Sequence, residues 1–406
     1  MEKDGLASSG NVNRLILRKQ RERLGIVLTV LIVAAAWIIG YFREDSDVLE
    51  SAMVVLPGAS QIDQKNALFI GKTAEDEIVG YAAVGEATGY GGPIKVIVGV
   101  DLNGGILGVE IIENRETPGF FRLVDSTGFV DQFIAKRFDS TLAINVDIDG
   151  ISGATLSAEG IAASIRQAVR IIASDGLESP LPAEKRQIKF GIPEIILIGL
   201  YTAGYFSHKQ KNVKLKSRFR WITLTTGMVV LGFIYTAPLT ISQVIALLSG
   251  YWPDWHNNLY WYLLIGGILF VTTVDAKNPY CAWFCPFGAF QETLAAISGA
   301  KHFRPRPWRK YLTWLPRILA MTAIVLGLAL RQPGVAGYEP FATLFDLRGT
   351  AIEWGLLVVT ILASLFLYRP FCNFICPIDP FVDFISAVRR LGKDAWIQWK
   401  PKPAQK

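Results

Sequence analysis

The stretch VDIDGISGATLSAEGIAASIRQAVR, residues 146–170, lies at the centre of the chain's soluble part. Its first half is a run of small residues that ends at the hydroxyl of Thr155. Its second half places isoleucine and valine on one helical face, which predicts a helix over 158–173 with Ser157 as its N-cap. Small residues before a helix form a turn, and they also let a bulky group approach the backbone. The stretch alone therefore predicts either a plain turn or a site beside Thr155.

Strand-like segments precede this helix. They are IVGYAAVGE (78–86), IKVIVGVDL (94–102) and ILGVEIIE (106–113). Asn103, Gly104 and Gly105 predict a hairpin turn between the last two strands. Residues 121–137 are expected to form a helix. We therefore predict an α+β domain over residues 43–189, joined to its neighbours by flexible tethers at 43–60 and 174–189.

The composition divides the chain into two parts. The 406 residues are 51% hydrophobic with a mean hydropathy of +0.33, which predicts membrane-spanning helices. Residues 43–189 hold 13 basic and 22 acidic residues, net −9, whereas the rest holds 28 basic and 13 acidic residues, net +15. A basic excess beside apolar runs is typical of cytoplasmic flanks, and no nucleic-acid-binding motif accompanies it. We expect no nucleic-acid partner.

The apolar runs predict about six spans. These are 24–42, 190–206, 221–244, 259–275, 312–330 and 351–368. The basic segment 1–23 places the N-terminus in the cytoplasm, and a cleaved signal peptide is the alternative for the first run. Basic loops at 208–220 and 301–310 agree with a cytoplasmic C-terminal segment, 378–406. We predict an α-helical polytopic protein of a bacterial cytoplasmic membrane, contacting lipid, with the α+β domain inserted outside the cell between the first span and a five-span portion, 190–377.

All four cysteines fall in two copies of one motif. NPYCAWFCPFGAF (278–290) aligns with RPFCNFICPIDPF (369–381) at an offset of 91 residues. Each copy follows a span that runs inward, so both cysteine pairs are expected at the cytoplasmic side. The thiols are Cys281, Cys285, Cys372 and Cys376.

The spacing of these cysteines indicates metal chemistry. Two thiols at i and i+4 share one helical face, and two such pairs supply the four thiolates of an iron–sulfur cluster or a tetrahedral zinc. Four buried free thiols, or two separate two-thiolate sites, are the alternatives. We favour a redox centre, with [4Fe-4S] ahead of [2Fe-2S].

Three segments together carry a family resemblance. GYGGPIKVIVGVD (89–101), ENRETPGFF (113–121) and DGISGATLS (149–157) occur in an order that resembles the FMN-binding domain shared by the G subunit of the Rnf complex, the C subunit of the Na⁺-translocating quinone reductase and the flavoprotein NosR. In that family the final threonine carries FMN through a phosphoester bond formed by an FMN transferase.

The resemblance implies a set of flavin-site residues. Thr155 would be the attachment point, Gly153 and Ala154 would give the transferase clearance, and Asp149, with Ser152, would belong to its recognition signal. The expected flavin pocket consists of Glu116, Thr117, Pro118, Gly119 and the backbone near Tyr90.

The membrane half resembles the NosR and NapH membrane proteins, which carry paired C-x-x-x-C-P motifs. Those proteins continue into a ferredoxin-like segment, whereas this sequence ends at Lys406. We therefore expect a separate ferredoxin-like or other redox partner subunit.

These features predict a membrane electron-transfer flavoprotein. Electrons would pass between a cytoplasmic or quinol donor and an external covalent FMN through the cysteine-ligated centre, and a partner reductase would supply or receive them. A bilayer core is about 30 Å thick, so the centre and the flavin are expected to be too far apart for one step. A redox sensor or a maturation factor for a metalloenzyme is the alternative, and a transporter is disfavoured because the spans contain few charges.

Overall fold

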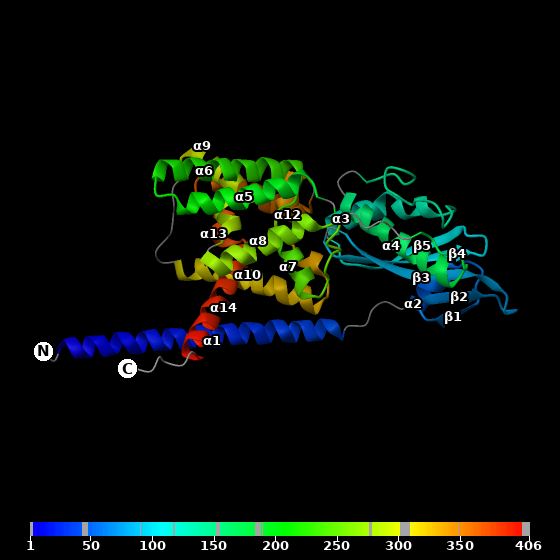
Figure 1. Cartoon of the computed structure of the whole chain (residues 1–406), viewed down its shortest axis with the longest axis horizontal. Coiled ribbons are helices and arrows are strands. Elements are labelled where there is room, and N and C mark those ends of the chain that lie inside the picture. Colours follow the sequence, from blue (N-terminus) through cyan, green and yellow to red (C-terminus); the bar gives the residue numbers. More distant parts are fainter. Residues whose placement is uncertain are drawn as a thin grey trace, which may run out of the picture.

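The chain folds into a helix bundle and a sheet-containing domain beside one end of it (Figure 1). The computed structural model describes residues 3–42, 48–89, 91–116, 118–151, 155–182, 188, 190–275, 278–300, 309–347 and 349–399. Helix α1 (Lys3–Tyr41) runs along the bundle, and the chain then builds the sheet domain and returns to the bundle. The predicted insertion of an α+β domain after the first helix is therefore observed.

Five antiparallel strands form the sheet in sequence order. They are β1 (Gln61–Lys65), β2 (Leu68–Lys72), β3 (Ile78–Thr88), β4 (Pro93–Asp101) and β5 (Ile106–Asn114). The three predicted strands are confirmed, as is their turn, where Gly104 has a φ of +85° that glycine adopts without strain. The first two strands were not predicted, because β1 is mostly exposed and gives no apolar alternation.

Helices cover both faces of this sheet. Helix α4 (Thr155–Asp175) packs with Val96 and Val98 of β4, while α2 (Val48–Val55) packs with Ile97, because successive side chains of a strand point to opposite faces. The approach of α4 is close: a Cβ on Gly85 would lie 1.9 Å from the carbonyl oxygen of Ser164.

These packed helices correct the predicted tethers. The tether over 43–60 is wrong for residues 48–60, since α2 buries Ala52 and Val55 against the sheet and β1 follows directly. The tether over 174–189 is wrong for its first part, since α4 continues to Asp175 and Leu177 and Leu181 pack against the core of the sheet domain. Residues 43–47, 183–187 and 189 lie outside the described residues.

Two predicted helix boundaries are also wrong. The helix expected over 121–137 is divided into α3 (Pro118–Ser126) and the 3-10 turn η1 (Phe129–Phe133), because Gly128 takes a left-handed φ of 59° between them. Helix α4 begins at Thr155, so Ser157 lies inside its first turn and is not the N-cap. Ser157 is 1% exposed, which explains why a small residue occupies that position.

The bundle consists of long helices joined by short ones. In chain order they are α5 (Ile192–Lys209), α6 (Val213–Thr226), the π-helical η2 (Gly227–Ile234), α7 (Ile241–Leu248), α8 (Leu259–Asp275), the π-helical η3 (Tyr280–Phe284), α9 (Pro286–Ser298), α10 (Arg309–Ala329), the 3-10 helix η4 (Pro333–Ala336), α11 (Phe341–Phe345), α12 (Ala351–Ser364), α13 (Pro370–Phe374) and α14 (Ile378–Trp399).

Among the residues that the structure describes, two helices are long and apolar enough to cross a membrane: Lys19–Tyr41 and Tyr311–Ala329. Ile192–Ser207, Leu259–Val274 and Ala351–Ser364 are shorter apolar helices, so the six-span topology stays a prediction. The segment 221–244 is not one helix, because the chain breaks after Ile234, with Thr236 at a φ of 45°, and α7 begins at Ile241.

Candidate redox sites

The predicted flavin attachment residue stands at a helix N-terminus. Thr155 is the first residue of α4, where backbone N–H groups and the helix dipole favour a phosphate. The side chain of Thr155 is not described, and Ser152, Gly153, Ala154, Tyr90 and Thr117 lie outside the described residues. Pro118 and Gly119 form the start of α3, and their surroundings are not described.

The loop that leads to Thr155 is held by two side chains. The Asp147 carboxylate accepts hydrogen bonds from the backbone N–H groups of Leu142 (2.8 Å) and Ala143 (2.6 Å). Burial opposes ionisation of Asp147, but these two donors prevail and lower its pKa. The Gln132 amide binds the backbone of Asp149 twice, since its oxygen accepts from the N–H at 2.8 Å and its nitrogen donates to the carbonyl at 3.4 Å. The exposed Asp149 is thereby fixed close before the α4 N-terminus.

Glu116 lies beside the glycine-rich turn. Its side chain is 4% exposed and accepts a hydrogen bond from the N–H of Gly91 at 3.0 Å. A Cβ on Gly89 would lie 1.7 Å from a Glu116 carboxylate oxygen, and a Cβ on Gly160 of α4 would lie 2.9 Å from the Cα of Gly89. Glu116, the glycine turn and the second turn of α4 thus form one compact cradle with no room for side chains at either glycine.

A charged group beside this cradle faces the bundle. Lys95 pairs with Glu113 at 2.7 Å, and Glu113 also pairs with Arg115. The Arg115 guanidinium lies 4.6 Å from the ring centre of Tyr251, and Arg331 approaches the same ring at 5.7 Å. Tyr251 belongs to the connection between α7 and α8, so this contact joins the sheet domain to the bundle. Sequence reasoning missed it because Arg331 and Tyr251 belong to no motif, and the segment 113–121 gives no sign that Arg115 faces the bundle.

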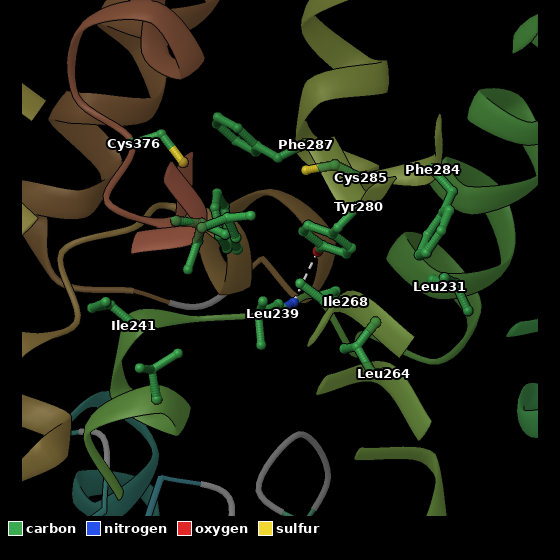
Figure 2. Close-up of a cluster of buried hydrophobic side chains, with 14 of the residues drawn as sticks. Leu231, Leu239, Ile241, Leu264, Ile268, Tyr280, Phe284, Cys285, Phe287 and Cys376 are labelled. Atoms are coloured by element: carbon green, nitrogen blue, oxygen red, sulfur yellow. Dashed lines mark hydrogen bonds between the residues drawn. The ribbon is translucent and has the colours of Figure 1, made fainter. Parts of the chain in front are cut away.

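The two cysteine motifs meet in the bundle and repeat their local geometry. Cys285 precedes α9 and Cys376 precedes α14, each followed by a proline that suits a helix start. Burial raises the pKa of Cys285 and of Cys376, and the backbone amides of Gly288 and Phe287 at the first thiol, and of Ile378 and Asp379 at the second, partly oppose that rise. The sulfurs of Cys285 and Cys376 point toward a common space beside Phe287 (Figure 2).

A buried glutamine orients the first cysteine of the second motif. The Gln291 amide is fully buried, donates to the sulfur of Cys372 at 3.2 Å and accepts from the N–H of Phe371 at 2.9 Å. Since Gln291 lies in α9, after the first motif, it ties the second motif to the first. Sequence reasoning missed this residue, which occupies an ordinary helical position.

The four thiols form one electrostatic group. Burial raises the pKa of Cys372 to about 12, and Cys285 adds to that rise while Arg369 opposes it. A thiolate there therefore needs a compensating cation or metal. Within the described residues, no three His, Cys, Asp or Glu side chains are close enough to hold a single metal ion. Zinc would draw four sulfurs to about 2.3 Å from one point. A multi-iron cluster holds its ligands farther apart, and four thiols are the donors it requires.

An unpartnered donor lies beside these thiols. Within the described residues, the buried Nε of Arg369 has no hydrogen-bond partner. A further group at the site would complete its bonding, so the donor set and this arginine fit an iron–sulfur cluster.

The cysteine motifs also contact the connections between long helices. The Tyr280 hydroxyl accepts from the N–H of Leu239 at 2.9 Å (Figure 2), and the Tyr338 hydroxyl donates to the carbonyl of Ile375 at 2.9 Å. Leu239 precedes α7 and Tyr338 precedes α11. Leu239 lies in the segment predicted as the span 221–244, whereas Tyr338 lies in the segment 332–349, which was expected to connect two spans on the external side.

Comparison with known proteins assigns both regions. Residues 89–170 match the model of an FMN-binding domain, and residues 257–305 and 352–395 match that of a 4Fe-4S binding domain. The chain is 31% identical to Protein NirI of Paracoccus denitrificans over 205 residues, covering 46% of this chain and 29% of that protein. It is 26% identical over 123 residues to the G subunit of the Na(+)-translocating ferredoxin:NAD(+) oxidoreductase complex of Acetobacterium woodii. That match covers 28% of this chain and 58% of the subunit.

Another relative is the G subunit of the ion-translocating oxidoreductase complex of Escherichia coli O157:H7, which is 36% identical over 99 residues, 21% of this chain and 48% of that protein. The crystal structure of Shewanella oneidensis NqrC is 18% identical, with a TM-score of 0.22 over 30% of this chain and 66% of that one, too low to bear on the fold.

These matches support FMN and an iron–sulfur cluster as cofactors of a redox, electron-transfer protein. The chain spans less than two thirds of the length of the relatives described here. Glu116, Asp149 and Thr155 lie inside the flavin match, and all four cysteines lie inside the 4Fe-4S match.

Proposed function

We propose that the protein is a polytopic membrane flavoprotein, similar to NosR and NapH, that moves electrons between the four-cysteine site and FMN bound covalently to Thr155. FMN exchanges one or two electrons, and an iron–sulfur cluster exchanges one. The role of the chain is to hold these groups near each other. Helix α11 carries this proposal, because Phe341 packs with the cysteine motifs while Ala342 packs against the sheet-domain core.

The flavin half of the proposal is supported by the start of α4. The helix N-terminus would stabilise the phosphoester, and the loop fixed by Asp147 and Gln132 would present Asp149 to an FMN transferase. Glu116 and the glycine turn would line the pocket. A covalent bond would prevent loss of the flavin from an extracytoplasmic domain.

The proposal that the protein spans a membrane is supported by apolar side chains that face outward from α1. Leu24, Val27, Leu28 and Leu31 of α1 are all more than half exposed, a surface that suits lipid. We propose the six-span arrangement with both termini in the cytoplasm, and a donor that is either a ferredoxin-like partner subunit or a quinol.

The test is ultraviolet in-gel fluorescence of the denatured full chain, co-expressed with an FMN transferase. We expect a fluorescent wild-type band that Thr155→Val abolishes. A dark wild-type band would contradict covalent FMN. In a parallel experiment, replacing Cys281 and Cys372 by Ser should abolish flavin reduction by the donor while the fluorescent band persists. Unchanged reduction would contradict a route through the cysteines.

A further inference from the structure

The two motif copies are hydrogen-bonded to each other through residues at equivalent positions. Asn278 and Arg369 stand three residues before the first cysteine of their copies. Asn278 donates to Asp379 at 3.1 Å and accepts from the N–H of Cys281 at 3.1 Å. Arg369 crosses in the other direction and donates to the carbonyl of Cys281 at 3.0 Å. The copies are therefore interlocked, but only one of them brings a positive charge.

That charge belongs to a network of three side chains, in which Arg369 and Glu292 are largely buried and Arg220 is 33% exposed. Arg369 is 11% exposed and lies 2.5 Å from Glu292, which is 6% exposed. Arg220 also donates to Glu292, at 2.7 Å. Burial opposes ionisation of Glu292, but Arg220 and Arg369 prevail and lower its pKa. Two cations and one anion leave this network with a net positive charge, while the Asp379 carboxylate acts on Cys281 and Cys372 from the other side.

A buried net charge is costly unless another charge compensates it. Neutral thiols do not compensate the positive charge of Arg369, whereas four thiolates around iron do, and reduction of such a cluster adds one further negative charge. The Arg369 cation acts on both Cys372 and Cys285, one cysteine from each motif. The Nε–H of Arg369 is a further donor near the thiols, and it has no hydrogen-bond acceptor among the described residues.

We propose that Arg369, held by Glu292, is a positioning residue that raises the reduction potential of the four-cysteine site. This inference rests on the proposed function, since it requires a redox cluster there. The physical basis is that a fixed cation stabilises the reduced, more negative state more than the oxidised state. Glu292 keeps the guanidinium in place and partly offsets its charge.

The sequence repeat supplies a matched control. Asp383 is the counterpart of Glu292 at the 91-residue offset, and it pairs with Arg317 at 3.6 Å. Both of these side chains are more than half exposed. Water screens their charges. Arg317→Gln therefore removes the cation at the equivalent place in the repeat, where its charge acts only weakly on the cysteine site.

The experiment is a redox titration of the full-length protein in detergent, followed by electron paramagnetic resonance of the cluster. Arg369→Gln is expected to reduce the ratio of reduced to oxidised cluster at least tenfold at a fixed potential, a shift of about 59 mV for one electron. Arg369→Lys, which keeps the positive charge, should have a reduction potential close to that of the wild type. Arg317→Gln should have the wild-type reduction potential. Glu292→Gln should shift the potential in the opposite direction, upward, which tests the proposal in a variant that keeps the cation.

Wild-type potentials in both Arg369→Gln and Glu292→Gln would overturn the inference. A wild-type protein that shows no cluster signal would instead overturn the iron–sulfur part of the proposed function. The two failures are therefore distinguishable.

Discussion

Phe341 and Ala342 are neighbours in α11, yet they pack into different domains. The ring of Phe341 lies 4.9 Å from that of Phe287 and 6.0 Å from that of Phe371, both close to cysteines in the sequence. Ala342 packs against the hydrophobic core of the sheet domain. Consecutive Cα atoms are about 3.8 Å apart, so α11 brings the cysteine motifs and the flavin domain to either side of one short helix.

Truncating Phe341 should loosen both sides of α11. Phe341→Ala removes a side chain that is 2% exposed, and we expect it to cost about 3–5 kcal/mol in the bundle. Hydrogen exchange measured by mass spectrometry should increase in α3 and η1 as well as in the cysteine motifs. Phe345→Ala is the control, because Phe345 packs on Phe233 at 5.0 Å. Equal exchange of the sheet domain in both variants would argue against the bridge.

Tyr251 should hold the sheet domain against the bundle. Its ring contacts Arg115 and Arg331, and each cation–π contact is worth about 0.5–2 kcal/mol. Tyr251→Leu should therefore broaden the distribution of distances between spin labels placed on the two domains. Tyr251→Phe keeps the ring and should leave the distribution narrow. If the Leu variant were as narrow as the wild type, Tyr251 would not be part of the docking contact.

Asp147 should stabilise the attachment loop in a pH-dependent way. Its pKa is lowered in the folded protein, so its contribution is present above the unfolded value of about 3.9 and is lost as pH falls through the folded value. Asp147→Ala leaves two backbone donors without their acceptor and should cost about 1–3 kcal/mol at pH 7.

The Asp147 effect can be measured as the difference in thermal unfolding between the full-length variant and wild type at several pH values. We expect the difference to shrink below about pH 4, because there Asp147 of the unfolded chain takes up a proton while the folded carboxylate, with its lowered pKa, is still ionised. A difference that is constant from pH 7 to about pH 3 would show that the charge does not matter. Incorporation of covalent FMN should fall in the variant at neutral pH, since the loop before Thr155 is no longer fixed.

The effect of a side chain at position 89 on flavin incorporation should depend on the carboxylate of Glu116. Gly89→Ala places a Cβ 1.7 Å from the carboxylate, so Glu116 must move and flavin incorporation should drop severalfold. In a Glu116→Ala background the same change should have a smaller additional effect, because its main obstacle is gone. In-gel fluorescence of the four proteins measures this coupling. Strictly additive losses would mean that Gly89 acts elsewhere, for instance through Ile94, which the new Cβ also approaches at 2.9 Å.

The sequence determined the features that depend on local pattern. Alternating apolar residues predicted β3, β4 and β5, helical periodicity predicted α4, and the repeat predicted that the cysteines act together. It did not predict β1, whose residues are mostly exposed, or the division of 121–137, which one left-handed glycine causes.

Only the tertiary structure decided which distant residues meet. Arg369 and Glu292 lie 77 positions apart, and the motif match contains no indication that they pair beside the thiols. Likewise, Leu239 lies in a segment predicted to be a span and Tyr338 in one expected to be an external connection, yet the backbone N–H of Leu239 and the hydroxyl of Tyr338 both contact the cysteine motifs. Local propensity acts over a few residues, whereas these contacts arise from packing of buried side chains between helices, which no short stretch of sequence encodes.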